Sequence, residues 1–149
     1  MNPTIQPYLT GDYLFHGSTH PALTRLLPNA PHDAGDDPRN KEVAVYATAE
    51  LAEAIIFALI GGFCGTFEVT RSPQGETLAR FPQRFAEQLS RNTGSLYVLP
   101  KSDLAVQDPW QYKSYTPVTP VTEISVTLQD YLDAGGKLEF TGAGTGSTT

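Results

Sequence analysis

The sequence has a single cysteine, Cys64, so no disulfide can form within the chain. Cys64 lies in the apolar stretch 55–67, a position typical of a buried small side chain rather than of a nucleophile. The three histidines are far apart along the chain and there is no cysteine pair, so the sequence predicts no metal site. A reducing compartment is compatible with this composition.

Positive charge is also scarce. Ten lysines and arginines stand against sixteen acidic residues, which gives a formal net charge of −6. Nucleic-acid binding usually requires a basic stripe that neutralises phosphates, so we expect no nucleic-acid partner. The alternative is a small local patch formed by the scattered arginines between residues 71 and 91.

Long hydrophobic runs are missing as well. No apolar stretch approaches the length of a membrane span, so we expect no membrane partner. The first residues contain neither the charged region nor the apolar core of a signal peptide. We therefore expect a cytoplasmic protein, although export by a specialised route would leave no readable signal.

Turn-forming residues, by contrast, are abundant. The chain has 12 prolines and 13 glycines in 149 residues, with 40% hydrophobic and 10% aromatic residues. This composition favours one globular domain that is β-rich or α+β, built from short elements. We expect that domain to cover residues 1–140, and we expect the low-complexity segment 141–149 to be a flexible tail.

Hydrophobic periodicity and chain breakers predict the individual elements. Short strands are predicted at residues 13–16, 42–46, 63–70, 94–100, 110–115, 123–128 and 135–139. A helix is predicted to start with Thr48 as its cap and to end at Gly61. The apolar residues Phe81, Phe85 and Leu89 recur at i, i+4 and i+8 and predict a second helical stretch over 77–92, broken near Pro82. The remaining segments are read as a loose arm at 1–10, a short helix or turn at 21–27, a surface loop at 28–41 and a short turn or helix at 128–132.

Two short motifs are the most informative feature of the chain. An apolar strand runs into His16-Gly17-Ser18, and a second apolar strand ends at Tyr46, before an alanine-rich helix. A histidine at a strand end offers a directional donor or acceptor to a ligand hydroxyl. A glycine lets its backbone approach a planar amide, and a tyrosine supplies a flat apolar face. In this order the motifs are typical of the front of a nucleotide-binding cleft.

His16-Gly17-Ser18 followed by Tyr46 resembles the first two elements of the His-Tyr-Glu signature of diphtheria-toxin-like ADP-ribosyltransferases, the group that contains the poly(ADP-ribose) polymerases. The resemblance implies an α+β, ADP-ribosyltransferase-like fold of two packed antiparallel β-sheets with short helices. It also implies NAD as a substrate, with no metal. His16 would bind a ribose hydroxyl, the Gly17 backbone would hold the nicotinamide amide, and Tyr46 would line the nicotinamide ribose.

The same resemblance assigns a residue on the helix that follows Tyr46. In the family, a second aromatic eleven residues after the signature tyrosine stacks on the nicotinamide ring, and that position is Phe57 here. A small hydroxyl residue often lies three positions earlier in the family. This chain has Ala54 there, so it lacks one hydrogen-bonding group for nicotinamide.

The third signature element of the family is a glutamate that opens a late strand. By position, Gln111 stands there, and a shift of a few residues would select Gln107 or Asp108 instead. A carboxylate can stabilise a developing ribosyl cation and polarise an acceptor, whereas a neutral amide can only form hydrogen bonds. With Gln111 in this place, the resemblance implies transfer of a single ADP-ribose rather than polymer growth.

The resemblance therefore implies a mono-ADP-ribosyltransferase that modifies a protein or small-molecule acceptor and releases nicotinamide. Catalytic roles would fall to His16, Tyr46 and Gln111. The alternatives are a non-catalytic module that binds NAD or ADP-ribose, and an NAD glycohydrolase toxin that labels no acceptor. A structural domain that binds neither ligand is a further alternative.

Overall fold

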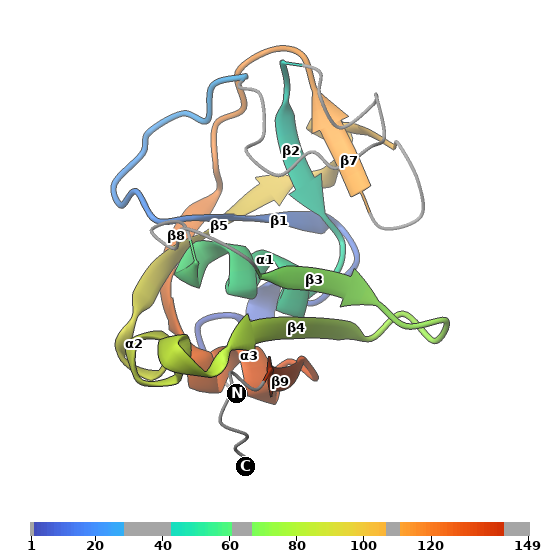
Figure 1. Cartoon of the computed structure of the whole chain (residues 1–149). Coiled ribbons are helices and arrows are strands. Elements are labelled where there is room, and N and C mark those ends of the chain that lie inside the picture. Colours follow the sequence, from blue (N-terminus) through green and yellow to red (C-terminus); the bar gives the residue numbers. More distant parts are fainter. Residues whose placement is uncertain (1, 29–42, 61–66, 107–110, 142–149) are drawn as a thin grey trace.

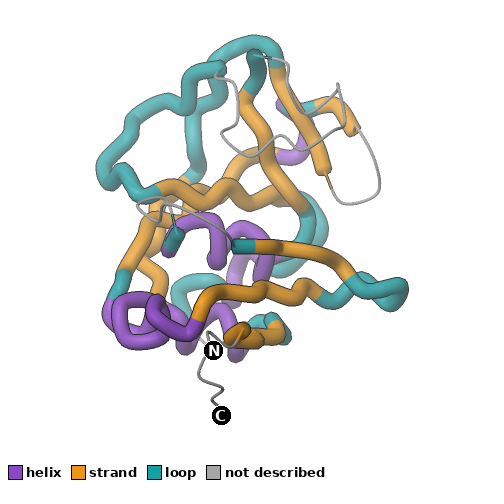
Figure 2. The backbone as a smooth tube through the Cα atoms, viewed as in Figure 1, coloured by secondary structure: helices purple, strands orange, loops and turns teal. Residues whose placement is uncertain are grey.

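The structure is a computed structural model that describes residues 2–28, 43–60, 67–106 and 111–141 (Figure 1). It shows a mixed α+β protein with two sheets in which antiparallel pairing dominates, joined by a few short helices. Figure 2 shows helices between and below the sheets, with loops connecting the strands. No described helix is both long enough and apolar enough to cross a membrane.

The larger sheet has six strands, and each neighbouring pair is antiparallel. In spatial order these strands are β6 (Ala105–Val106), β7 (Gln111–Ser114), β2 (Val45–Thr48), β1 (Tyr13–Ser18), β5 (Thr93–Pro100) and β8 (Thr122–Thr127). β1 pairs with β5 along its whole length, but it meets β2 only where Phe15 lies opposite Thr48. The sheet therefore forks between β1 and β2, and Figure 1 shows β2 and β7 rising steeply away from β1 and β5.

The smaller sheet has three strands and lies on the other side of the first α-helix (Figure 1). β3 (Glu68–Arg71) and β4 (Thr77–Pro82) form an antiparallel hairpin, and β9 (Lys137–Thr141) joins β4 in parallel. The helices are α1 (Leu51–Leu59), α2 (Ala86–Arg91) and α3 (Leu128–Asp133), with short 3-10 turns η1 (Gln6–Tyr8), η3 (Gln83–Phe85) and η4 (Lys101–Asp103).

The main hydrophobic core surrounds α1. This helix is apolar on nearly all sides, which is expected of a helix packed between two sheets. Its buried residues join side chains from both sheets and from α2 and α3, including Phe15, Phe81, Leu89, Leu96, Val98, Val126 and Tyr131. A second, smaller cluster covers the opposite face of the large sheet and includes Leu14, Leu26, Tyr97 and Leu99.

The expected start of α1 is wrong by two residues. The Thr48 hydroxyl accepts a hydrogen bond from the Glu50 backbone N–H at 2.9 Å, and Glu50 itself caps the helix by accepting from Ala52 N–H at 3.3 Å. Thr48 is the last residue of β2 and is held by its pairing with β7. Sheet pairing therefore extends two residues further than the sequence pattern indicated, and the helix starts later.

The predicted second helical stretch is wrong over its first half. Residues Thr77–Pro82 form strand β4, in which Thr77, Ala79 and Phe81 are buried in alternation. Burial with a period of two residues favours a strand, because one face of β4 then packs on the core while Leu78 and Arg80 lie on the other face. Only Ala86–Arg91 is α-helical, and it buries Leu89 as expected.

Smaller differences concern the chain ends and the loops. The arm at 1–10 is anchored rather than loose, because the Ile5 side chain is completely buried. Residues 21–27 contain no helix and instead carry an isolated bridge between Leu26 and Val118. The turn or helix expected at 128–132 and the last strand are confirmed as α3 and β9. Most of the expected surface loop, Cys64 and nearly all of the expected tail lie outside the described residues.

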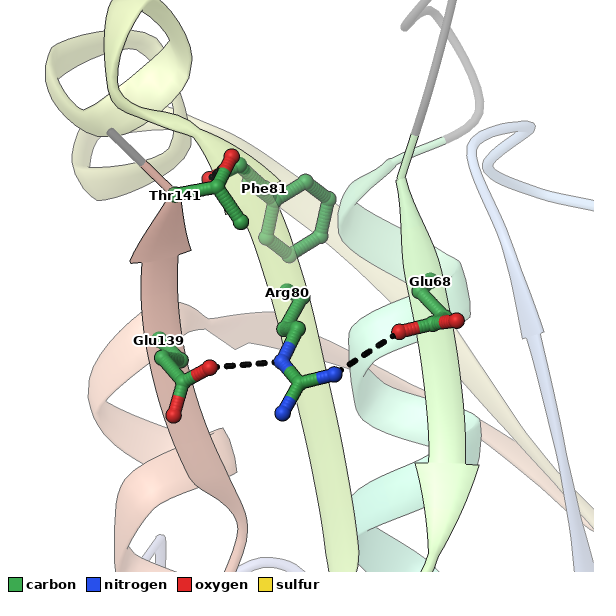
Figure 3. A network of polar contacts seen from close by, with 5 residues as sticks. All are labelled: Glu68, Arg80, Phe81, Glu139 and Thr141. Atoms are coloured by element: carbon green, nitrogen blue, oxygen red, sulfur yellow. Dashed lines mark hydrogen bonds and ion pairs between the residues drawn. The ribbon is translucent and has the colours of Figure 1, made fainter. Parts of the chain in front are cut away.

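A charged network ties the three strands of the smaller sheet together on its exposed face (Figure 3). Arg80 of β4 donates from Nε to Glu139 of β9 at 2.5 Å and from Nη1 to Glu68 of β3 at 3.1 Å. The hydrogen bond to Glu139, followed by that to Glu68, raises the pKa of Arg80. Since all three side chains are well exposed, solvent screens the network, and its main effect is on the strand arrangement.

Candidate functional site

The fork between β1 and β2 leaves backbone groups outside the sheet ladder. Asp12 lies just before β1 and is opposite Lys101, which follows β5. The Asp12 carbonyl accepts a hydrogen bond from the Lys101 N–H at 3.1 Å, so these two residues form a hydrogen-bonded pair of the ladder. Hydrogen-bonded pairs alternate along an antiparallel ladder, so His16 also bonds to β5, while Phe15 and Gly17 direct their peptide groups toward β2. Phe15 meets Thr48 there, but the ladder ends at that pair. By this alternation the N–H and C=O of Gly17 point to the β2 side of β1, beyond the last pair of the ladder.

His16 stands at the branch point of this fork. Its Nδ1 lies 2.6 Å from the backbone carbonyl of Tyr46. A carbonyl oxygen can only accept, so Nδ1 must carry the hydrogen and Nε2 is the unprotonated nitrogen of the neutral ring. Burial lowers the pKa of His16, opposed by the hydrogen bond to Tyr46, so the neutral ring prevails near pH 7. Nε2, which has no hydrogen-bond partner among the described residues, is then an acceptor for a hydroxyl group.

Gly17 is required by the packing of α1 as well. A Cβ atom at this position would lie 1.9 Å from the carbonyl oxygen of Ala54 and 2.7 Å from the backbone nitrogen of Ala58. The helix backbone thus rests directly on β1, and Ala54 is buried. The glycine at position 17 consequently has a structural explanation that is independent of any ligand.

Tyr46 and Gln111 lie on the same face of the sheet as Gly17. In the register between β2 and β7, Tyr46 is opposite Lys113, and Thr48 is opposite Gln111. Opposed residues of two strands share a face, and every second residue along a strand lies on the same face. Thr48 is opposite Phe15, which packs against α1, so Tyr46 and Gln111 lie on the face toward α1. Gln111 is the first residue of β7. The structure thus places the predicted positions Gly17, Tyr46 and Gln111 on three adjacent strands and on one face.

The side chains of His16 and Ser18 point to the opposite face. His16 reaches the Tyr46 carbonyl but not the face on which the Tyr46 side chain lies. The Ser18 hydroxyl accepts a hydrogen bond from the His20 N–H at 3.0 Å and shapes the turn after β1. Phe57 is on α1 and is half-buried against the main core. The alternatives Gln107 and Asp108 lie outside the described residues.

A row of polar side chains next to His16 could not be predicted from the sequence. Tyr97 lies opposite His16 in the pairing of β1 with β5, and Glu123 lies opposite Tyr97 in the pairing of β5 with β8. The ring centroids of His16 and Tyr97 are 6.4 Å apart. Burial raises the pKa of Tyr97, whereas a hydrogen bond from Ser95 lowers the pKa of Glu123. Strand pairing brings these residues together, and no sequence spacing reveals it.

Two surface cavities lie on the described part of the chain, and the smaller one reaches Phe15, whose pairing with Thr48 marks the closed end of the fork. One, of about 730 Å³, is an open hollow between the arm at Asn2–Tyr8 and strand β8. The other, of about 240 Å³, is lined by residues such as Tyr8, Tyr13 and Leu51. Neither is lined by His16, Tyr46 or Gln111. Two segments that precede β2 and β7 in the chain, 29–42 and 107–110, lie outside the described residues. The fork is therefore chosen as the candidate site by the chemical groups of its residues and not by the volume of a cavity.

Within the described ranges, no group of three or more histidine, cysteine, aspartate or glutamate side chains is arranged to hold a metal ion. Comparison of the chain with protein-family models, with curated proteins and with solved structures finds no match. The functional interpretation accordingly rests on the geometry of the fork and on the motifs that flank it.

Proposed function

We propose that the protein has an ADP-ribosyltransferase-like fold, binds NAD at the β1–β2 fork and transfers a single ADP-ribosyl group to a protein or small-molecule acceptor. The observation that supports the proposal is the end of the β1–β2 ladder at Phe15 and Thr48, since the alternation of the ladder then turns the N–H and C=O of Gly17 toward the fork. A primary carboxamide such as that of nicotinamide carries the complementary acceptor and donor, so it matches this pair of groups.

The neighbouring residues fit the remaining parts of the dinucleotide. The lone pair on His16 Nε2 can accept a hydrogen bond from a ribose hydroxyl. Tyr46 supplies an aromatic surface on the face that carries Gly17, and Phe57 lies on the helix packed behind it. These groups would orient NAD, and orientation is a large part of the catalysis of such a transfer.

In the proposed reaction the bond between the nicotinamide nitrogen and the ribose C1′ breaks, and its electron pair leaves with neutral nicotinamide. The ribose passes through an oxocarbenium-like state, and an acceptor nucleophile forms the new bond to C1′ while its proton passes to solvent. Gln111 would hold the 2′-hydroxyl with its amide, but it has no negative charge to stabilise the cation. This supports transfer of one unit rather than chain growth.

A second candidate function is a non-catalytic module that binds NAD or ADP-ribose. Two features favour it: the neutral Gln111 at the start of β7 and the buried Ala54, which lacks a hydroxyl. Such a module would use the same fork and leave the glycosidic bond intact.

Release of nicotinamide from NAD by the purified protein, with and without cell extract as a source of acceptor, tests the proposal. We expect release by the wild type and by Arg91→Ala, a control whose exposed side chain lies on α2, and its loss in His16→Ala. No release, with a melting temperature that still rises on adding NAD, would support the binding module and reject the transferase. The absence of both release and thermal shift would reject both functions.

A further inference from the structure

The segment after β1 crosses the sheet face on which His16 lies. We call residues 19–27 the strap; it contains no helix and is fixed at its far end by the bridge between Leu26 and Val118. In Figure 1 this segment bulges outward beside β8 before it turns toward β2 and β7. Among the described residues, the backbone of the strap is hydrogen-bonded at the Leu26 bridge, to the Ser18 hydroxyl through the His20 N–H, and to side chains of β5 and β8.

Two side chains of the sheet hold the backbone of the strap. The Tyr97 hydroxyl donates to the His20 carbonyl at 2.6 Å and accepts from the Leu23 N–H at 3.1 Å. The Glu123 carboxylate accepts from the Ala22 N–H, with both oxygens 3.0 Å from the nitrogen. Tyr97 and Glu123 thus bind three closely spaced backbone groups of one short segment.

The strap is held in a conformation that its sequence does not favour. Ala22 has a φ of 61°, and it is the non-glycine residue with positive φ within the described ranges. A Cβ is crowded in this left-handed region, so an alanine persists there only where its surroundings fix the backbone. The hydrogen bond from the Ala22 N–H to Glu123 supplies that restraint.

Glu123 is itself positioned for this contact. The Ser95 hydroxyl donates to its Oε2 at 2.7 Å, so a neighbouring strand orients the carboxylate. That hydrogen bond also lowers the pKa of Glu123, which keeps it a charged acceptor at neutral pH. Tyr97 links the strap to the candidate site, because its ring lies beside His16 while its hydroxyl holds His20 and Leu23.

We propose that Glu123 is a positioning residue that, with Tyr97, latches the strap over the sheet face carrying His16, so that the strap borders the ribose-binding side of the NAD site. The identity of the ligand rests on the proposed function, but the latch does not depend on it. Loss of the latch would free the strap, and a ligand held by His16 would lose one wall of its site.

Hydrogen exchange of the Ala22 and Leu23 amides, followed by NMR without NAD, tests the latch. In Glu123→Ala we expect exchange at Ala22 to accelerate about tenfold or more, the effect of losing a hydrogen bond to a charged group. Glu123→Gln retains one acceptor oxygen and should give an exchange rate at Ala22 between those of the wild type and Glu123→Ala. This variant also tests the latch if Glu123→Ala does not fold. Glu87→Ala is the control, since Glu87 is highly exposed and far along the chain.

The second measurement is the kinetics of nicotinamide release. Glu123→Ala and Tyr97→Phe should raise the KM for NAD several-fold and change kcat less, because the strap borders the ligand and does not touch the broken bond. Unchanged exchange at Ala22 in Glu123→Ala, or equal acceleration in Glu87→Ala, would overturn the latch. Accelerated exchange with an unaltered KM would overturn the placement of the strap at the site. If the wild type releases no nicotinamide, the proposed transferase fails, whereas the exchange rates still decide the latch.

Discussion

The two sides of strand β1 differ sharply in how they are paired. Toward β5 the strand is paired along its whole length, but toward β2 it keeps one bridge, between Phe15 and Thr48. The β5 side serves stability, since Leu96, Val98 and Leu99 are completely buried there. On the β2 side, the peptide groups of Gly17 lie beyond the last pair of the ladder, and the ring of His16 is hydrogen-bonded to the Tyr46 carbonyl. One strand thus supports the core with one edge and supplies the candidate site with the other.

This difference shows where binding groups become available. A complete ladder consumes every backbone donor and acceptor, whereas an interrupted one leaves some for a ligand. Burial of a large apolar side chain contributes about 1.5–3 kcal/mol, and the β5 side has several such residues. The fork has few such buried apolar side chains, so we expect local unfolding at the fork to require less free energy than local unfolding of the core.

The largest effect should come from adding a side-chain atom where α1 packs directly on β1. In Gly17→Ala the new Cβ would meet the Ala54 carbonyl oxygen at 1.9 Å, so β1 or α1 must shift. We expect a loss of about 3 kcal/mol in the free energy of unfolding, measured by urea denaturation, because overpacking a tight contact costs this much.

Gly11→Ala is the matched control for that variant. Gly11 has a φ of 91°, and beyond its chain neighbours no heavy atom lies within 4 Å of the place a Cβ would take, so only backbone strain opposes the substitution. We expect a loss of about 1 kcal/mol. Equal losses in the two variants would show that β1 and α1 are not as closely packed as the structure indicates.

The pH dependence of stability should distinguish the fork from the core. Burial lowers the pKa of His16 below its ordinary value of 6.5. Between the folded and the ordinary pKa the unfolded chain binds more protons than the folded one, so stability is lost as pH falls through 6.5. The loss is at most about 1.4 kcal/mol per pH unit and stops below the folded pKa.

His16→Gln lacks this titration and provides the comparison. We expect the difference in unfolding free energy between wild type and variant to shrink from about pH 7.5 to about pH 5.5, as measured by urea denaturation at each pH. A difference that stays constant over this range would mean that His16 titrates alike in the folded and unfolded chain, and that its ring is not held neutral at the fork.

The smallest effect should come from the exposed face of the smaller sheet. Arg80→Met removes both ion pairs in Figure 3, but these pairs are exposed and screened by solvent. We expect a slight fall in melting temperature that disappears at about 1 M salt, where charges are screened within a few ångströms. Arg91→Met, which removes one exposed pair with Glu87 at 3.5 Å, should have a still smaller effect. A large fall in the melting temperature of Arg80→Met that does not depend on salt would show that these ion pairs are not screened by solvent.

Several elements could be predicted because their signals are local. The strand that runs into His16 and the strand that contains Tyr46 have short apolar runs bounded by turn residues, and the strand that starts at Gln111 lies in a stretch that alternates polar and aromatic residues. Residues 77–82 could not be assigned correctly, since Phe81 fits a helical spacing with Phe85 and Leu89 and also fits the alternation of a strand. Pairing with β3 and β9 decides in favour of the strand.

The sequence by itself determined the α+β class, the short elements and the order in which His16, Gly17, Tyr46 and Gln111 follow one another. It could not show that the ladder between β1 and β2 ends after one pair, that α1 rests on Gly17, or that Tyr97 and Glu123 hold the strap. Local propensity depends on residues close in the chain, whereas these contacts join residues tens of positions apart. Only the packing of the folded chain decides them.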